Sequence, residues 1–451
     1  MEAAVSLRVP LCGLPCSEIR IASCPEDWPR ATGGCPACRA ALAMPYDEGT
    51  SPSVGGRPVS EAQALAAAAA LLQEARQPFL FGLSLSGCGT ARKAASIARR
   101  LGAALDVEGA EPLENDLRSL RVFGLASATF GEVSRRADVV LLWRCDPRAD
   151  HPRLLPPRPM GAGSAERLFI LAPPVADAAG EPGADTFSGR PAAEGASHLL
   201  PIAAGGDLDA LLRLRAIACG RGPTAGGSAT EAGGDPLADL RRAGEALRRA
   251  RYAAIVWDAS ATRGPAGVAI ASTLALLTRD LNAQGRAAAR PIGSGGNVAG
   301  AMSAILSDCG YPRAVGFAGG FPREAPEVFG ATPMLQGGAD ALLLIGARSV
   351  AERGAAAVQK RGTVVIGPCL PEGCARPEVF IPTAVPALSE RGLWVRADGF
   401  PVPMRAPVPP ARPTEGEVLD RLLGRLAAAR STSPLSADPG SRPRAGVRKE
   451  D

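Results

Sequence analysis

Four cysteine residues near the N-terminus have the spacing of metal ligands. Cys12 and Cys16 form a C-x3-C pair, and Cys35 and Cys38 form a C-x2-C pair roughly 18 residues later. Short loops bring such thiolates together at little entropic cost, and thiolates bind structural zinc and iron–sulfur clusters. The spacing predicts a metal site. It leaves open the alternatives of four small apolar residues in a loop region and of a decayed site.

A fifth cysteine, Cys88, lies in the stretch GLSLSGCGTA, between an apolar run and a helical pattern. A thiol at the N-terminus of a helix is favoured as thiolate by the helix dipole. Cys88 is therefore a candidate cofactor-binding residue. The alternative interpretation is a small residue in a tight turn.

Three more residues are candidates because of where they lie along the chain. The glycine-rich stretch GSGGNVAGA at 293–301 leads into a helical pattern, and its backbone N–H groups can approach an anion, which selects Gly296 and Asn297 as cofactor-binding candidates. His151 follows the apolar run at 137–143. An isolated histidine beside proline and arginine is usually structural, and the position of His151 after a strand is what makes it a candidate.

The elements that must position these residues alternate along the chain. Apolar runs predict strands at 78–84, 137–143, 167–173, 253–259, 339–347 and 362–367. Helical patterns occur at 60–75, with Ser60 as N-cap, at 89–102, ending at Gly102, and at 207–218 and 267–281. This alternation predicts parallel sheets covered on both faces, with ligands at the carboxyl ends of the strands.

Composition predicts four consecutive parts. Residues 1–55 are expected to form a Cys-rich lobe, residues 56–225 an α/β lobe, and residues 236–430 a second α/β lobe. A glycine-rich stretch of low complexity at 221–236 separates the two α/β lobes. The tail at 431–451 has almost no large apolar residue and is predicted to be disordered.

Charge and hydropathy exclude several classes of function. The chain has 451 residues, of which 46% are hydrophobic, and its 50 Lys and Arg residues are not gathered into blocks, so no nucleic-acid partner is expected. No apolar stretch of about 18 residues lacks a charge, and the first 25 residues lack a signal-peptide core. We therefore expect no membrane partner and a cytoplasmic location. With only two histidines, no His-rich metal site can be built from this chain alone.

In six segments, taken in order, the chain resembles the B subunit of formylmethanofuran dehydrogenase, a relative of the molybdopterin-dependent formate dehydrogenases. These segments are LCGLPCSEI, FLFGLSLSGCGTARKAASIARRLGA, TFGEVSRRADVVLLWRCDPRADHPR, GGNVAGA, GYPRAVGFAGGFPREAPE and VFIPTAVPALSERGLWVRADGFPVPMR. The resemblance implies an α/β fold like that of molybdopterin oxidoreductases (formate dehydrogenase-like), with several parallel-sheet α/β lobes and a small Cys-rich N-terminal segment.

The chain departs from this family where the family holds its iron–sulfur cluster. A C-x2-C-x3-C run and one distant cysteine bind a [4Fe–4S] cluster in the family, and the resemblance places Val9 at the first of these positions, with Cys12, Cys16 and Cys38 at the others. Valine cannot ligate iron, so Cys35 would have to replace the missing thiolate.

A second departure concerns the redox centre. The resemblance places Cys88 at the family's metal-binding cysteine, with Gly89 where active members usually carry histidine. Residues 292–295 stand where active members resemble MRGH. Formate/CO2 interconversion needs a charged partner for the carboxylate and a group that manages its proton, and glycine supplies neither. The α/β lobe over 56–225 is therefore expected to carry a degenerate metal loop.

These departures favour a related assembly, the formyltransferase/hydrolase complex of methylotrophic bacteria and planctomycetes. The resemblance implies that this chain is the B subunit of that complex, acts in tetrahydromethanopterin-linked one-carbon metabolism from formaldehyde to formate, and has a structural or carrier-cavity role. The implied partners are the amidohydrolase-like A subunit, the C subunit, the D subunit (the transferase) and a furan-type C1 carrier. Zinc or a residual iron–sulfur cluster is the expected cofactor, with molybdopterin or tungstopterin lost. The alternative is an active Mo/W-pterin enzyme that interconverts CO2 or formate and the formyl-furan carrier.

Overall fold

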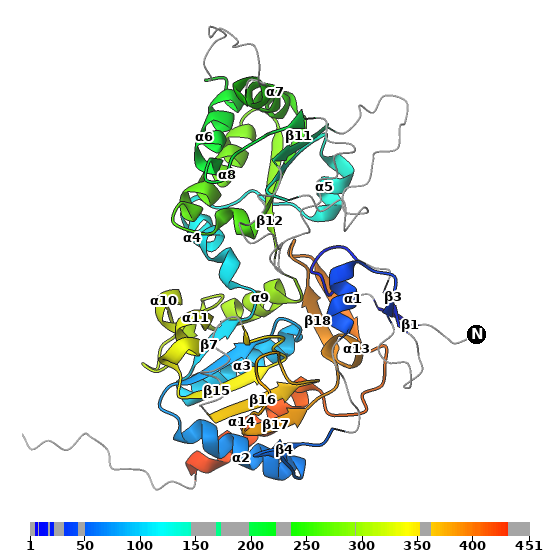
Figure 1. The fold of residues 1–451 in the computed structure, drawn as a ribbon, viewed down its shortest axis with the longest axis vertical. Coiled ribbons are helices and arrows are strands. Elements are labelled where there is room, and N and C mark those ends of the chain that lie inside the picture. Colours follow the sequence, from blue (N-terminus) through cyan, green and yellow to red (C-terminus); the bar gives the residue numbers. More distant parts are fainter. Residues whose placement is uncertain are drawn as a thin grey trace, which may run out of the picture.

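The protein is described by a computed structural model in which two large bodies, each built on a sheet, lie one beyond the other (Figure 1). The structure describes residues 5–7, 9–16, 19–21, 31–43, 50–145, 168–172, 198–221, 236–293, 295–351 and 362–431. The candidate His151 and the predicted disordered tail after residue 431 lie outside these residues. No helix of the described part is long and apolar enough to cross a membrane.

The first body contains a nine-stranded sheet. Its five central strands are parallel, in the order β7 (Ala104–Val107), β6 (Pro78–Gly82), β15 (Ala341–Ile345), β16 (Gly362–Gly367) and β17 (Val379–Pro382). Antiparallel strands complete the edges, namely β13 (Val315–Gly316) and β14 (Arg323–Glu324) beside β7, and β4 (Ser53–Val54) and β5 (Arg57–Pro58) beside β17. Both faces are covered, and apart from Asp106 in β7 and Thr363 in β16 the central strands contain only apolar residues and glycine.

Four long helices cover one face of this sheet, namely α2 (Glu61–Glu74), α3 (Cys88–Leu101), α9 (Val298–Cys309) and α14 (Glu415–Ser431). The other face packs on short helical segments, namely α10 (Pro326–Phe329), α11 (Ala331–Pro333) and a π-helical turn at Met334–Gly338. The predicted helix ends are confirmed. Ser60 and Gln63 form a capping box on α2, and Gly102 ends α3 with φ +67°.

The second body contains a five-stranded parallel sheet. Its order is β10 (His198–Leu199), β9 (Leu168–Ala172), β8 (Val139–Trp143), β11 (Tyr252–Asp258) and β12 (Arg286–Ile292). One face packs on α6 (Asp207–Ala218), α7 (Pro236–Arg249) and α8 (Gly267–Leu281). The helices α4 (Glu114–Phe123) and α5 (Phe130–Arg136) lead the chain into this body, after a 3-10 turn at Glu111–Leu113. Another 3-10 turn, Ala259–Thr262, follows β11.

The N-terminal segment and a C-terminal hairpin pack together beside both bodies (Figure 1). The segment comprises β1 (Val5–Leu7), β2 (Ile19–Ile21), β3 (Ala31–Thr32) and α1 (Pro36–Leu42), and the hairpin region comprises α13 (Pro386–Ser389), β18 (Arg391–Val395) and β19 (Pro401–Arg405). Their apolar side chains share one buried cluster with the free face of the five-stranded sheet.

The two sheets do not follow the predicted division into lobes at 56–225 and 236–430. All five strands of the second body lie between β7 and β13, so the second body is inserted into the chain of the first. Each predicted lobe contributes strands to both sheets. The glycine-rich stretch that suggested a boundary connects α6 to α7 within the second body. Pairing between strands distant in sequence, rather than linker composition, sets the architecture.

Candidate functional site

The four N-terminal cysteines come together in space. The Sγ atoms of Cys12, Cys16, Cys35 and Cys38 all lie within 4.8 Å of one another. Cys35 is the N-cap of α1, which places Cys38 in the first turn of the same helix, whereas Cys12 and Cys16 come from the turn after β1. Three of the thiols are buried and Cys16 is half-buried. None forms a disulfide in the described part of the chain.

Every sulfur of this cluster accepts a backbone N–H. The N–H of Leu14 donates to Cys12 over 3.4 Å, and the N–H of Cys35 donates to Cys16 over 3.3 Å. The N–H of Cys38 donates to Cys35 over 3.4 Å, and the N–H of Cys12 donates to Cys38 over 3.3 Å. Such donors stabilise negative charge on sulfur. The four cysteines could therefore bind a metal ion as thiolates.

The thiols of the cluster differ in pKa because they interact with one another. The Cys12 thiol donates to Leu14 O over 3.7 Å. Its interaction with Cys16 lowers the pKa of Cys16 to about 6 and raises the pKa of Cys12 above its ordinary value. Burial and neighbouring sulfurs also raise the pKa of Cys38. Four thiolates this close repel one another, so complete ionisation requires a cation among them.

Val9 fills the position where the resemblance places the first cluster ligand. Its side chain is 2% exposed and packs in the same apolar cluster as Leu7, Leu11 and Trp394. Cys35 joins the other three cysteines, which is the substitution that the sequence suggested. Val9 is thus part of the hydrophobic core.

Cys88 is the first residue of α3, directly after the carboxyl end of β6. Its thiol is half-buried, and burial raises the pKa of Cys88, which the hydrogen bond from Asn297 and the charge of Arg92 only partly oppose. Burial thus favours the neutral thiol of Cys88 over the thiolate.

Two carboxyl groups from the C-terminal part of the chain lie beside the start of α3, bonded to Ser86 just before the helix and to Thr90 in its first turn. The hydroxyl of Ser86 donates to Oε2 of Glu415 over 2.5 Å, and the hydroxyl of Thr90 donates to Oε1 of Glu390 over 2.8 Å. Glu415 has no exposed surface, and its Oε1 has no hydrogen-bond partner in the described residues; nor does Oε2 of Glu390. Burial, followed by repulsion from Glu390, raises the pKa of Glu415 to about 8.

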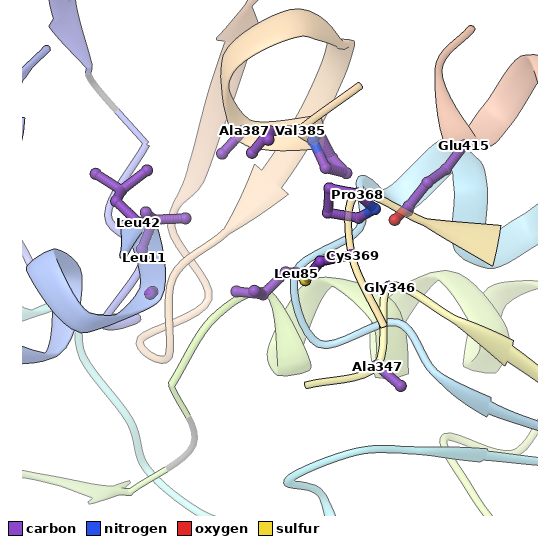
Figure 2. Close-up of a pocket in the computed structure, with 12 residues that line it drawn as sticks. Leu11, Leu42, Leu85, Gly346, Ala347, Pro368, Cys369, Val385, Ala387 and Glu415 are labelled. Atoms are coloured by element: carbon purple, nitrogen blue, oxygen red, sulfur yellow. The ribbon is translucent and has the colours of Figure 1, made fainter. Parts of the chain in front are cut away.

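Glu415 faces a small cavity at the carboxyl edge of the nine-stranded sheet. Figure 2 shows its side chain reaching toward Pro368, with Leu11 and Leu42 of the N-terminal segment on the opposite side. About 10 Å³ of this cavity is accessible to water, which is room for about one molecule. Burial and the charge of Glu415 raise the pKa of the neighbouring Cys369. This cavity, at the edge where parallel α/β sheets bind ligands, has no room for a larger ligand.

Gly296 and Asn297 join three segments. The N–H of Gly296 donates to Leu11 O over 2.8 Å, and the N–H of Asn297 donates to Ser84 O over 2.6 Å. The side chain of Asn297 donates to Ser86 O over 2.7 Å and accepts the N–H of Val395 over 2.7 Å. With no exposed surface, its amide is used by the protein. Gly296 and Asn297 were selected as cofactor-binding candidates. Their contacts hold the three segments of the site together.

Gly89 and Gly293 lie where the chain departs from the family pattern, and the space around the two residues differs. A Cβ atom added at Gly89 would meet nothing within 4 Å, so this position is open. Gly293 has φ +121°, and a Cβ there would lie 3.1 Å from Oδ2 of Asp258. A larger side chain thus fits at Gly89 but not at Gly293.

At the carboxyl end of β11, another predicted location for chemistry, Asp116 of α4 is bound by its neighbours. Asp116 accepts Nε1–H of Trp257 over 2.9 Å and the hydroxyl of Thr262 over 2.8 Å. Burial raises the pKa of Asp116 to about 6, against these two hydrogen bonds. The group joins α4 to the second body.

Sequence reasoning missed Ser86, Glu390 and Glu415. Glu415 lies 329 residues from its partner Ser86, and its sequence context, PTEGEVLD, has only the pattern of an acidic first turn of a helix. No local signal connects these residues.

The chain is similar to known proteins. No protein-family model matches the chain. The B subunit of the tungsten-containing formylmethanofuran dehydrogenase 2 of Methanococcus maripaludis is 25% identical over 371 residues, which cover 79% of this chain and 82% of that protein. The corresponding protein of Methanocaldococcus jannaschii is 26% identical over 364 residues, which cover 78% and 79%.

A solved structure is similar as well. A chain in the X-ray crystal structure of the formyltransferase/hydrolase complex (FhcABCD) from Methylorubrum extorquens in complex with methylofuran matches with a TM-score of 0.68 and 27% identity. The match covers 85% of this chain and 100% of that chain. These similarities confirm the resemblance inferred from the sequence and the molybdopterin oxidoreductase-like α/β fold class.

Proposed function

We propose that this chain, a relative of the B subunit of formylmethanofuran dehydrogenase, is the B subunit of a formyltransferase/hydrolase complex and no longer carries out redox chemistry. The observation that carries the proposal is the structural match, which spans the whole of a chain in such a complex. Its partners are then the A, C and D subunits, together with a furan-type C1 carrier. The complex would act in the oxidation of formaldehyde to formate.

The loss of the pterin cofactor is supported by the first turn of α3. A pterin guanine dinucleotide is a large anion with two phosphates, and helix N-termini are common sites for such groups. Here the carboxyl groups of Glu390 and Glu415 lie beside the start of α3, bonded to the hydroxyls of Thr90 and Ser86, and the cavity next to Glu415 holds about one water molecule. These residues do not fit an anionic cofactor.

For the N-terminal cysteines we propose a single zinc ion. Zinc–sulfur bonds of about 2.3 Å place the sulfurs of a tetrahedral site about 3.8 Å apart, whereas an iron–sulfur cube inserts four irons and four sulfides between its ligands. The observed upper limit of 4.8 Å between any two sulfurs favours the single ion. Cys12, Cys16, Cys35 and Cys38 would hold it, and the ion would stabilise the N-terminal segment.

An experiment on the purified, co-expressed complex tests the proposal. We expect formate release from a formylated carrier, no reduction of an artificial electron acceptor, and about one zinc ion per chain without tungsten or molybdenum. The second candidate, an active Mo/W enzyme, is favoured by Cys88 and by the tungsten enzymes among the relatives. Tungsten or molybdenum in the protein, together with formyl-dependent dye reduction, would establish that candidate and refute the first.

A further inference from the structure

Glu415 is a buried carboxyl group of which one oxygen is left without a partner. Its Oε2 accepts the hydroxyl of Ser86 over 2.5 Å, whereas its Oε1 has no hydrogen-bond partner in the described part of the chain. The side chain has no exposed surface and lines the small cavity at the edge of the nine-stranded sheet (Figure 2). An ionised carboxylate in such a place would lack the water or cation that it needs. The closed cavity therefore requires Glu415 to carry a proton.

The titratable groups around Glu415 do not replace that proton. Glu390, directly before β18, adds its repulsion to the effect of burial. Cys369, in the loop after β16, offers a thiol whose pKa is raised by burial and then by the charge of Glu415. Lys93 of α3 is engaged elsewhere, since it donates to Asp420 over 2.6 Å. An ionised Glu415 would therefore depend on water for its stabilisation.

The wall of the cavity opposite Glu415 belongs to the N-terminal segment. Leu11 and Leu42 lie on that side (Figure 2), and Ala41 lines the same cavity. All three are buried in the cluster that the segment shares with the hairpin region and the five-stranded sheet. The apolar side chains of α14 instead belong to the cluster that covers the nine-stranded sheet. The cavity thus lies at the boundary between two clusters of buried side chains.

Few hydrogen bonds hold the N-terminal segment against the rest of the described protein. Its strands β1, β2 and β3 form a sheet of their own. The backbone N–H groups of Gly296 and Ala397 donate to the segment, to Leu11 O over 2.8 Å and to Gly13 O over 2.9 Å. Leu11 is therefore both part of the cavity wall and the acceptor of one of these bonds.

The helix that carries Glu415 is held more firmly. Ion pairs join α14 to α2 and α3, namely Arg421 with Glu61 and Asp420 with Lys93. The helix also buries four apolar side chains against the same helices and the sheet, namely Val418, Leu419, Leu422 and Leu426. Water that reaches Glu415 is therefore expected to displace the N-terminal segment rather than α14.

We propose that Glu415 is a proton-dependent latch for the N-terminal segment. While the carboxyl group carries its proton, Leu11, Ala41 and Leu42 close over it. When the three side chains lift away, water reaches the carboxyl group, the proton leaves to solvent, and the segment separates from the edge of the nine-stranded sheet. The latch needs only residues of this chain, so it is independent of the proposed function and of a bound metal.

The latch sets how often the segment opens at each pH. Glu415 has a pKa of about 8 in the closed structure and an ordinary value of 4.5 once it is hydrated. Opening therefore releases a proton between these two values. By linkage, the equilibrium constant for opening should rise about 50-fold from pH 6 to pH 8 and level off at higher pH.

Hydrogen exchange of single amides in the purified full chain tests the latch. The N–H of Gly296 donates to Leu11 O and is freed when the segment lifts, whereas the N–H of Asn297 donates to Ser84 O within the first body. Protection is measured relative to the unfolded chain at the same pH. Gly296 should exchange at least about tenfold faster than Asn297, and its protection should fall about 50-fold from pH 6 to pH 8.

Two variants provide the controls. Glu415→Gln cannot ionise and keeps an acceptor for Ser86, so the protection of Gly296 in this variant should not change with pH. Glu417→Gln changes an exposed carboxyl group of the same helix and should keep the wild-type pH dependence. Protection of Asn297 in each variant checks that the first body remains folded.

Three results would overturn the latch. The first is a wild-type protection of Gly296 that is independent of pH, which decides the matter even if a variant does not fold. The second is an unchanged pH dependence in Glu415→Gln. The third is equal exchange of Gly296 and Asn297, because the N-terminal segment would then not open separately. None of these results bears on the proposed function, which metal content and formate release test.

Discussion

The hydroxyl of Ser86 donates a 2.5 Å hydrogen bond to Oε2 of Glu415, joining the loop after β6 to the first residue of α14. This contact places a buried carboxyl group at the N-terminus of α3, opposite Leu11 of the N-terminal segment (Figure 2). Residues from three distant parts of the chain, namely the N-terminal segment, the loop after β6 and the start of α14, thus meet at the carboxyl edge of the nine-stranded sheet.

Glu415 makes stability dependent on pH. Below its ordinary pKa of 4.5, Glu415 is protonated in both the folded and unfolded states, and from there to about pH 8 only the unfolded state ionises. Wild-type stability should therefore fall as pH rises across this interval, by up to about 5 kcal/mol. Glu415→Gln, which keeps an acceptor for Ser86, should remove the share of this loss that Glu415 causes and leave the smaller share of Asp116, whose pKa is raised to about 6. Urea unfolding between pH 5 and pH 8 measures it.

The control for Glu415 is Glu417→Gln, two residues further along α14. Glu417 is exposed and caps the helix by accepting the N–H of Thr414, a bond that glutamine can also make. This variant should keep the wild-type pH profile. A profile of Glu415→Gln that parallels the wild type would show that Glu415 is not the group responsible.

Removal of one cysteine should release the metal proposed for the N-terminal cluster. In Cys38→Ala, which loses a sulfur with no exposed surface, zinc measured by elemental analysis should fall from about one per chain to near zero, and the melting temperature should drop. Cys374→Ala removes a buried thiol outside the cluster and should lower the melting temperature without changing the zinc content. Equal zinc in both variants would exclude the four-cysteine site.

Gly296 should tolerate no side chain. Its φ is +66°, and a Cβ atom would lie 2.2 Å from Ser84 O. Gly296→Ala should therefore cost about 3 kcal/mol or more in the free energy of unfolding. Gly55, with φ +56° and open space around it, is the matched control, since Gly55→Ala carries only the left-handed backbone penalty of about 1 kcal/mol. Chemical denaturation of both variants gives the comparison, and equal costs would mean that the contact with Ser84 relaxes freely.

Gly89 should accept the histidine that active members of the family usually carry. The space around its Cβ position is open, so Gly89→His should change the free energy of unfolding by no more than about 0.5 kcal/mol. We expect no dye-linked oxidation of the formyl group by a complex containing this variant, because Glu390 and Glu415 still lie beside the start of α3. Dye reduction above the wild-type background would contradict the proposed loss of the cofactor.

Local patterns in the sequence predicted the local structure well. As expected, Ser60 is the N-cap of α2 and Gly102 ends α3. The apolar runs form buried strands. The four cysteines selected by their spacing do converge. The order of the strands was not predictable in this way. Linker composition says nothing about which distant strands pair, so the insertion of one sheet into the other was missed.

The same limit applies to the site. Cys88 could be selected because a turn and a helix start are visible in ten residues of sequence. The carboxyl groups around it could not, since Glu390 and Glu415 reach α3 only through tertiary packing, roughly 300 residues away along the chain. Asn297 shows the opposite case. Its position in a glycine-rich loop predicted that it binds a cofactor, whereas the hydrogen bonds of its amide go to Ser86 and Val395 of the same chain.

The insertion of the five-stranded sheet between β7 and β13 constrains how such a protein can change over evolution. Truncation from either end would remove helices or strands that cover the nine-stranded sheet, whereas replacing single side chains leaves every strand in place. Selection for a shape that fits neighbouring subunits would thus preserve every strand of both sheets even if, as proposed, the redox reaction is lost.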